Sequence, residues 1–198
     1  MRRTVSLAIL AAVAMTGTAV AQDKLRLALV PKAMNNPFFD LARDGCKKAE
    51  QDDASIECVY IGPGEHTEME QIQIVQDLIS QGVDGIAVSP SNAPAMAKAL
   101  RAAQEAGIPV MTWDADLLEE DKGIRSTFVG TKNYDIGVNL AKIAQELHPD
   151  GGNVCLQTGG AAAANHNERL LGIRETLAGE NLGDPPGSML DGQGGWTE

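Results

Sequence analysis

The stretch "DGIAVSPSNAPAMAKALRAAQEAGIPVMTW", residues 84–113, contains a strand, a helix and a second strand in succession. Two short apolar runs, 84–89 and 108–113, flank a segment in which apolar residues recur at the spacing of one helix face. Asn92 can cap the helix at its beginning, and Gly107 can end it. Short loops join the three elements, so the stretch predicts a βαβ unit with parallel strands.

The same alternation extends along most of the chain. Several of the runs are almost continuously apolar, which is typical of parallel strands covered on both faces. The expected strands are 25–30, 56–61, 84–89, 108–113, 125–130 and 153–158. Further helices are expected at 37–52, begun by Asn36 and Pro37, and at 134–147 and 163–178. The pattern predicts an α/β fold with a doubly wound parallel sheet.

A break in the alternation suggests two lobes. The segment "DADLLEEDKGI", residues 114–124, is too short and polar for another packed helix, and the pattern resumes at Tyr134. We therefore expect an N-terminal α/β lobe at 22–130 and part of a C-terminal α/β lobe at 131–198. The second part is small for a closed domain, so we expect more of that lobe beyond Glu198.

The first residues have the pattern of a secretory signal. A basic start and an apolar run precede the small-residue exit Ala19-Val20-Ala21. We expect cleavage after Ala21, with 1–21 as signal peptide and the mature protein in the periplasm. The competing interpretation is an N-terminal helix of the fold. It is disfavoured because this run has no polar face, which a helix of a soluble protein needs toward water.

Charge and cysteine content limit the function classes. The formal net charge of −11 repels phosphate backbones, so we expect no nucleic-acid partner. Cys46, Cys58 and Cys155 lack metal-ligand spacing. An oxidising compartment permits a Cys46–Cys58 disulfide, and buried free thiols are equally compatible with the sequence.

The ends of the expected strands indicate where a ligand would bind. In open parallel sheets ligands bind at the carboxyl ends of the strands, where Lys32 and Asp114 are placed. These two residues are either cleft groups or a structural ion pair at a loop rim. Phe38 and Phe39 either pack in the core or face the crevice. Their side chains are about 100° apart on a helix, so they cannot point the same way.

No catalytic or cofactor pattern stands out. The three histidines are scattered without metal-ligand spacing, and neither G-x-S-x-G nor a P-loop occurs. We therefore expect no enzyme, no metal and no cofactor.

Four segments resemble a known family: "LALVPKAMNNPFFDLARDGCKKA", "VQDLISQGVDGIAVSPSN", "AGIPVMTWDAD" and "NHNERLLGIRETL". They resemble the periplasmic sugar-binding proteins of ABC importers, in the branch of the ribose-binding and autoinducer-2-binding proteins. The resemblance runs from about Lys24 to Glu198. It implies the type I periplasmic-binding-protein fold, with two lobes, a hinge of three crossings and the ligand in the cleft. It also implies an inner-membrane permease and its ATPase as partners, and no catalysis.

The resemblance also implies a set of ligand contacts. Asn36 would bind ligand hydroxyls, and Phe38 and Phe39 would lie against the apolar face of the sugar ring. Asp114 would accept hydrogen bonds from a pair of hydroxyls. Arg169 would clamp hydroxyls from the second lobe. The implied ligand-binding residues are Lys32, Asn36, Phe38, Phe39, Trp113, Asp114, Asn165, His166, Asn167, Arg169 and Trp196. Vicinal hydroxyls suit bidentate charged groups, and a sugar's C–H face suits an aromatic ring.

Departures from the family pattern narrow the ligand. Lys32 stands where ribose binders have a small hydroxyl residue, and Ala115 stands where they have Arg. Lys32 and Thr112 to Asp114 match autoinducer-2 receptors instead, but Asn165-His166 replaces the Asp-Gln pair of those receptors. We expect a pentose, hexose or polyol other than ribose. The alternative is an autoinducer-2-type signal receptor, with a chemoreceptor as a further partner. A sugar-responsive repressor would need a helix-turn-helix where the signal lies.

Overall fold

Five parallel strands build one sheet in a computed structural model that describes residues 24–198. The signal peptide expected at 1–21 lies outside the described residues. The strands lie in the order β2-β1-β3-β4-β5, and every neighbouring pair is parallel. Their bounds are Leu25–Val30 for β1, Ile56–Tyr60 for β2, Gly85–Val88 for β3, Val110–Trp113 for β4 and Thr127–Val129 for β5. The predicted α/β class is confirmed.

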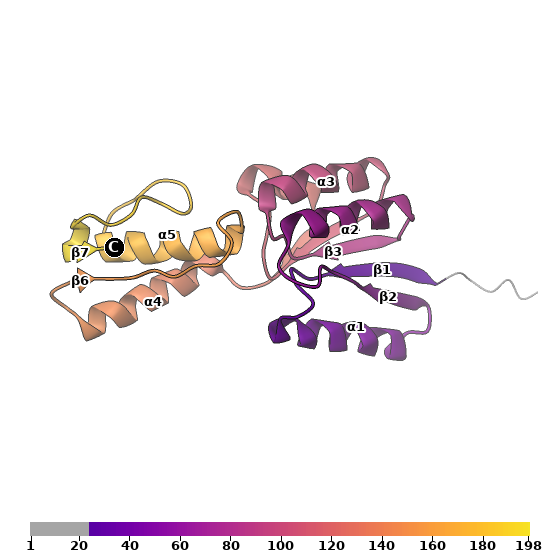
Figure 1. Ribbon diagram of the computed structural model, residues 1–198, viewed down its shortest axis with the longest axis horizontal. Coiled ribbons are helices and arrows are strands. Elements are labelled where there is room, and N and C mark those ends of the chain that lie inside the picture. Colours follow the sequence, from indigo (N-terminus) through magenta and orange to yellow (C-terminus); the bar gives the residue numbers. More distant parts are fainter. Residues whose placement is uncertain (1–23) are drawn as a thin grey trace, which may run out of the picture.

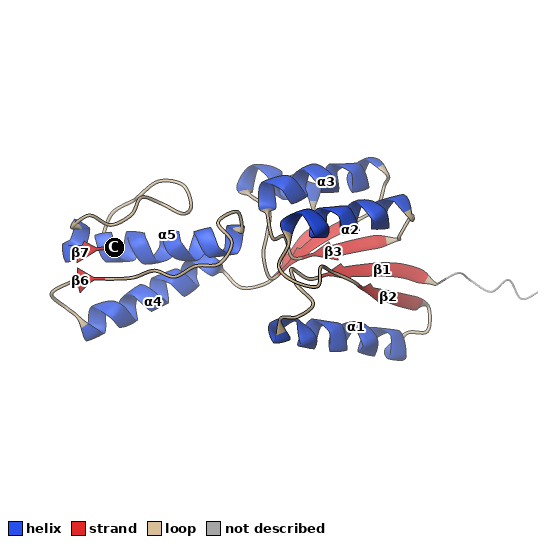
Figure 2. Ribbon diagram, in the orientation of Figure 1, coloured by secondary structure: helices blue, strands red, loops and turns tan. Residues whose placement is uncertain are grey.

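Three helices pack on the sheet. α1 (Asp40–Asp52) lies on one side, and α2 (Glu68–Ser80) and α3 (Ala93–Glu105) lie on the other (Figures 1 and 2). The caps predicted at Asn92 and Asn36 are confirmed. The side chain of Asn92 accepts from the N–H of Ala95 at 3.0 Å, and that of Asn36 accepts from the N–H of Phe38 at 3.0 Å. Asn36 begins a short 3-10 helix that leads directly into α1.

The core lies between the sheet and the helices α2 and α3. It includes Val30, Val88, Met96 and Leu100, whose side chains are fully buried. Each such side chain contributes about 1.5–3 kcal/mol when it leaves water. This burial fixes the register of the strands and thereby the positions of the loops at their carboxyl ends.

The expectation that both faces of the strands are covered is wrong for part of the sheet. Within residues 24–198, the α1 side of β3 and β4 carries an apolar hollow of about 380 Å³ that includes Leu27, Ala87 and Met111. A helix is about 10 Å wide and strands lie about 4.8 Å apart, so α1 covers only about two strands.

After β5 the chain leaves the sheet and forms a helix pair. α4 (Asn133–Leu147) and α5 (Ala164–Ala178) lie side by side, away from the five-stranded sheet (Figure 1). Two glycines let the helices approach closely. A Cβ at Gly137 would collide with the carbonyl of Arg169, and a Cβ at Gly172 with the carbonyl of Tyr134. Both predicted helices are thus confirmed and packed backbone to backbone.

The strand predicted at 153–158 is mostly wrong. Of the predicted run, the structure has a strand only at its start, where β6 (Gly152–Asn153) pairs with β7 (Trp196–Thr197). The N–H of Val154 donates once more to Thr197, at 2.8 Å. Within residues 24–198, β7 is two residues long, so the apolar run beyond Val154 meets no backbone partner there that would extend the ladder. Periodicity alone cannot supply that partner.

The cysteine question is resolved by the fold. Cys46 of α1 and Cys58 of β2 form a disulfide with their Cα atoms 5.6 Å apart, while Cys155 is free and exposed. The disulfide ties the edge strand to its covering helix. Among residues 24–198, the helices are all too short or too polar to cross a bilayer.

Candidate functional site

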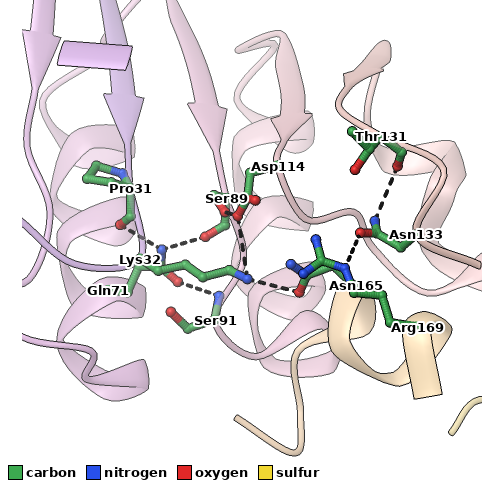
Figure 3. A network of polar contacts seen from close by, with 10 residues as sticks. All are labelled: Pro31, Lys32, Gln71, Ser89, Ser91, Asp114, Thr131, Asn133, Asn165 and Arg169. Carbon is green, nitrogen blue, oxygen red and sulfur yellow. Dashed lines mark hydrogen bonds and ion pairs between the residues drawn. The ribbon is translucent and has the colours of Figure 1, made fainter. Parts of the chain in front are cut away.

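The strand order places three polar side chains at one edge of the sheet. The order of the strands reverses between β1 and β3, and such a switch point opens a crevice at the carboxyl ends. Lys32 follows β1, Ser89 follows β3 and Asp114 follows β4. Figure 3 shows the three side chains turned toward one another. Neighbouring parallel strands therefore assemble a site from residues far apart in the chain.

A cavity of about 530 Å³ lies at this edge, between the sheet and the start of α5. It brings together most of the ligand contacts expected from the sequence. Those that line it are Lys32, Asn36, Phe38, Phe39, Asp114, Asn165, His166 and Arg169. The first five come from the sheet region and the last three from α5, so both parts of the chain contribute.

Lys32 is the most buried charge in the cavity wall, with 5% of the residue exposed. Its Nζ donates to Oδ1 of Asn165 at 3.0 Å and lies 3.6 Å from Oδ2 of Asp114. Burial lowers the pKa of the Lys32 ammonium, and Arg169 lowers it further, while Asp114 acts in the opposite direction. The two readings of Lys32 and Asp114 are thus compatible, because the ion pair itself lines the cavity.

Asp114 occupies an unusual backbone conformation. Its φ is 60°, and the N–H of Ala115 donates to the carbonyl of Trp113 at 2.6 Å across a three-residue turn. Such a turn at a non-glycine residue costs roughly 1–3 kcal/mol and is tolerated best by Asp or Asn. The Oγ of Ser89 donates to Oδ2 of Asp114 at 2.6 Å. The turn aims the carboxylate into the cavity instead of along the strand.

Asp116, two residues later, has a structural role instead. Arg125 donates to both of its carboxylate oxygens at 2.6 Å, and the Thr112 hydroxyl donates at 2.6 Å. Burial would raise the pKa of Asp116, but these hydrogen bonds together outweigh it and lower the pKa. With its oxygens occupied by protein donors, Asp116 joins β4 to β5 and does not line the cavity.

Gln71 holds the strand-end loops in place, and the sequence analysis missed it. Its side chain is fully buried and donates to the carbonyls of Pro31 and Ser89 at 2.9 and 2.8 Å. Its Oε1 accepts from the N–H of Ser91 at 2.9 Å (Figure 3). The available signal was spacing, since Gln71 shares one face of α2 with the buried residues Val75 and Leu78.

The two phenylalanines both line the cavity but differ in burial. Phe39 is 3% exposed, whereas Phe38 is 64% exposed, and their rings meet edge to face with centroids 5.1 Å apart. Trp113 does not line the cavity. It packs edge to face against Phe39 at 5.5 Å and so supports the aromatic wall from behind.

The α5 side of the cavity carries Arg169 and His166. Nε of Arg169 donates to Oδ1 of Asn133 at 2.9 Å, and Nδ2 of Asn133 donates to the carbonyl of Thr131 at 3.3 Å. Burial lowers the pKa of His166, and the positive charges of Lys32 and Arg169 lower it further. Lowering its pKa favours the neutral ring of His166, so Arg169 is the charge that α5 adds to the cavity lining.

Besides Trp113, two predicted contacts lie outside the cavity lining. Asn167 donates to the carbonyl of Ala161 at 2.9 Å and borders a separate cavity of about 410 Å³. Trp196 is 4% exposed and packs against Leu177 and Leu190 in the core of the helix pair. Its apolar ring is satisfied there, so the structure does not bring it to the cavity.

The cavity lining also contains residues that sequence reasoning did not select. These are Ala33, Asn35, His66, Gly159 and Gly160. A Cβ at Gly159 would press against the His166 ring, so any larger residue there would require that ring to move. Within residues 24–198, no group of three or more metal-ligating side chains is arranged to hold a metal ion.

Comparison with known proteins gives a consistent result. Residues 27–196 match the model of the periplasmic binding protein domain family. The D-ribose/D-allose-binding protein of Pseudomonas aeruginosa is 30% identical over 89% of this chain and 60% of its own length. The ribose import binding protein of Escherichia coli is 27% identical over 90% of this chain and 58% of its own length.

A solved structure agrees with both sequence relatives. An ABC transporter solute-binding protein of Burkholderia graminis, in complex with D-arabinose, is 34% identical with a TM-score of 0.71. The match covers 80% of this chain and 53% of that one. This chain therefore spans little more than half the length of the proteins it matches.

Proposed function

Because the chain belongs to the periplasmic binding protein domain family, we propose that it captures a sugar or polyol of the pentose or hexose class. In this proposal it acts in the periplasm and delivers the ligand to an inner-membrane ABC permease and its ATPase. It catalyses no reaction. The observation that carries the proposal is the cavity of about 530 Å³, to which the sheet region and α5 both contribute polar and aromatic groups.

The lining suits a polyhydroxylated ligand. Asp114 presents a carboxylate that can accept from two neighbouring hydroxyls, and the amide of Asn36 keeps its donor nitrogen free of protein acceptors among residues 24–198. Phe38 exposes a ring face against which the C–H face of a sugar can stack. These groups combine apolar contact with a few directed polar contacts.

Closure of two lobes would trap the ligand. We propose that residues 22–130 form one lobe and 131–198 part of the other, with the crossing at 130–132 acting as one hinge strand. A ligand that touches groups on both sides, such as Asp114 and Arg169, binds the closed form better than the open form. That difference in affinity is what would let the permease recognise the loaded protein.

Titration calorimetry on the full natural protein with a panel of pentoses, hexoses and polyols tests the proposal. We expect at least one ligand to bind, and Asp114→Ala to weaken it by about tenfold or more, because a charged hydrogen-bond acceptor is lost. Asp44→Ala is the matched control, since this carboxylate is exposed on α1. The function is refuted if no ligand in the panel binds, and the site is refuted if Asp114→Ala binds as tightly as wild type.

An autoinducer-2-type receptor is the second candidate. The observation in its favour is the Lys32–Asp114 pair on the cavity wall, at 3.6 Å, which matches the resemblance noted for those receptors. A chemoreceptor would then be an additional partner. Release of autoinducer activity from protein purified under mild conditions and then denatured would support this candidate, and its absence after exposure to the signal would eliminate it.

A further inference from the structure

The charges around the cavity are unbalanced. Within residues 24–198, Lys32 and Arg169 are the cationic groups of the lining and Asp114 is its one carboxylate. The other titratable groups there are His66 and His166. The whole chain has a formal net charge of −11. The lining, with an excess of one positive charge, therefore has a net charge of the opposite sign to that of the chain.

One oxygen of this carboxylate, Oδ2, is already engaged by the protein. Oδ2 of Asp114 accepts from Ser89 at 2.6 Å and lies 3.6 Å from Nζ of Lys32. It therefore compensates Lys32 and does not reach Arg169 with a hydrogen bond.

Arg169 keeps most of its binding capacity. Its Nε donates to Asn133, but within residues 24–198 its two terminal nitrogens donate to no protein acceptor. Figure 3 shows its guanidinium beside the ammonium end of Lys32. Two cations side by side in a half-buried site repel each other unless an anion lies against them.

The start of α5 adds to the positive potential. This helix of 15 residues begins at Ala164, and its N-cap, Ala163, has no side chain that could cap the first N–H groups. Unsatisfied N–H groups at a helix N-terminus amount to about half a positive charge. Asn165 and His166 of this first turn line the same cavity.

Resting on the proposed sugar-binding function, we propose that the preferred ligand is a sugar acid, a monocarboxylated sugar or polyol such as a uronate or an aldonate. Its carboxylate lies against Arg169 and Lys32, and its hydroxyls lie at Asp114 and Asn36. A guanidinium binds a planar carboxylate through two parallel hydrogen bonds. The excess of one positive charge matches a monoanion better than a phosphate ester, which carries close to two negative charges.

Matched pairs of ligands test the inference on the full natural protein by titration calorimetry. The pairs are D-galacturonate with D-galactose, D-glucuronate with D-glucose, and D-gluconate with D-glucitol. We expect the acid of at least one pair to bind about tenfold or more tightly than its neutral partner. In Arg169→Gln, which keeps a donor but removes the charge, the acid should fall to the affinity of the neutral partner.

The outcomes separate this inference from the function on which it rests. Neutral sugars that bind as tightly as their acids in every pair overturn the inference and leave the sugar-binding function standing. Failure of every acid and every neutral sugar overturns both. The comparison of each acid with its neutral partner uses the wild-type protein, so it does not depend on whether a variant folds. Arg169→Lys provides a second variant that retains charge, and the inference expects it to keep part of the preference for the acid.

Discussion

Nζ of Lys32 donates a hydrogen bond of 3.0 Å to Oδ1 of Asn165, although 133 residues separate the two along the chain. Lys32 follows β1, which lies between β2 and β3 in the sheet, and Asn165 lies in the first turn of α5. The bond therefore joins the two parts of the chain across the cavity. A backbone hydrogen bond also joins the two parts, from the N–H of Ala93 to the carbonyl of Ala162 at 3.0 Å.

Lys32→Met should weaken ligand binding by about tenfold or more. Met preserves the length and apolar stem of the side chain but removes the donor to Asn165 and the charge beside Asp114, and a charged hydrogen bond contributes roughly 1.5–3 kcal/mol. Calorimetry with the best ligand of the panel measures the loss. Lys48→Met is the control, because Lys48 forms an exposed pair with Asp52 that should not affect binding. Equal affinity in Lys32→Met and wild type would show that Lys32 is not part of the site.

Gln71→Leu should lower the free energy of unfolding by about 3 kcal/mol or more. Leu fits the volume of the site but leaves the carbonyls of Pro31 and Ser89 and the N–H of Ser91 buried without these partners, at roughly 1–3 kcal/mol for each group. Urea denaturation followed by circular dichroism measures the change.

Gln73→Leu on the same helix is the matched control for Gln71. Gln73 is exposed and donates to Asp77 at 2.8 Å, so its replacement should change stability by only a few tenths of a kcal/mol. If both substitutions had the same effect, the brace formed by Gln71 would have no special role in holding the strand-end loops.

His166 should titrate below the usual histidine range of about 6.5. Burial lowers its pKa first, and the charges of Lys32 and Arg169 lower it further. The folded state then binds fewer protons than the unfolded state, so stability falls as the pH drops below about 6.5 and is unaffected above it. Nuclear magnetic resonance of the ring protons measures the midpoint, with His166→Gln used for assignment.

A double test separates the causes of the His166 shift. Lys32→Met should raise the pKa of His166, because one nearby positive charge is gone. His166→Gln should lose less stability than wild type between pH 7.5 and pH 5.5 in urea denaturation. A His166 midpoint at or above the usual value would contradict both expectations.

Breaking the Cys46–Cys58 disulfide should reduce the free energy of unfolding by about 2–3 kcal/mol. The bond closes a short loop, with a sequence separation of 12, and the chain-entropy estimate for loops of this size is close to 3 kcal/mol. Cys46→Ser with Cys58→Ser tests this in urea, and Cys155→Ser is the exposed control. Alkylation should add one group before reduction and three after it. Three additions without reductant would contradict the disulfide.

The order of elements and their caps could be predicted because they depend on local patterns. Apolar runs located β1 to β5 within one or two residues, and Asn36 and Asn92 marked the helix starts that the structure shows. The candidate site could be located in part, because residues that follow parallel strands must lie at one edge of the sheet. Lys32 and Asp114 were placed by this reasoning.

Long-range partners could not be predicted in the same way. The run at 153–158 reads as a strand, but a strand exists only where a second backbone accepts its hydrogen bonds, and β7 provides two residues. The family resemblance implies a ligand contact for Trp196, yet its neighbours Leu177 and Leu190 place it in a hydrophobic core. Neither outcome is encoded within a few residues of the position concerned.

The sequence by itself determined the α/β alternation, the helix boundaries and the polar groups available at the strand ends, since these depend on contacts a few residues apart. Only the tertiary structure decided that Asp114 faces the cavity, whereas both carboxylate oxygens of Asp116 accept hydrogen bonds from Arg125. The reason is geometric, because the turn at Asp114 and the position of Arg125 depend on how β4 and β5 pair. The same holds for Lys32 and Asn165, whose bond requires the first turn of α5 to lie at the strand-end edge of the sheet.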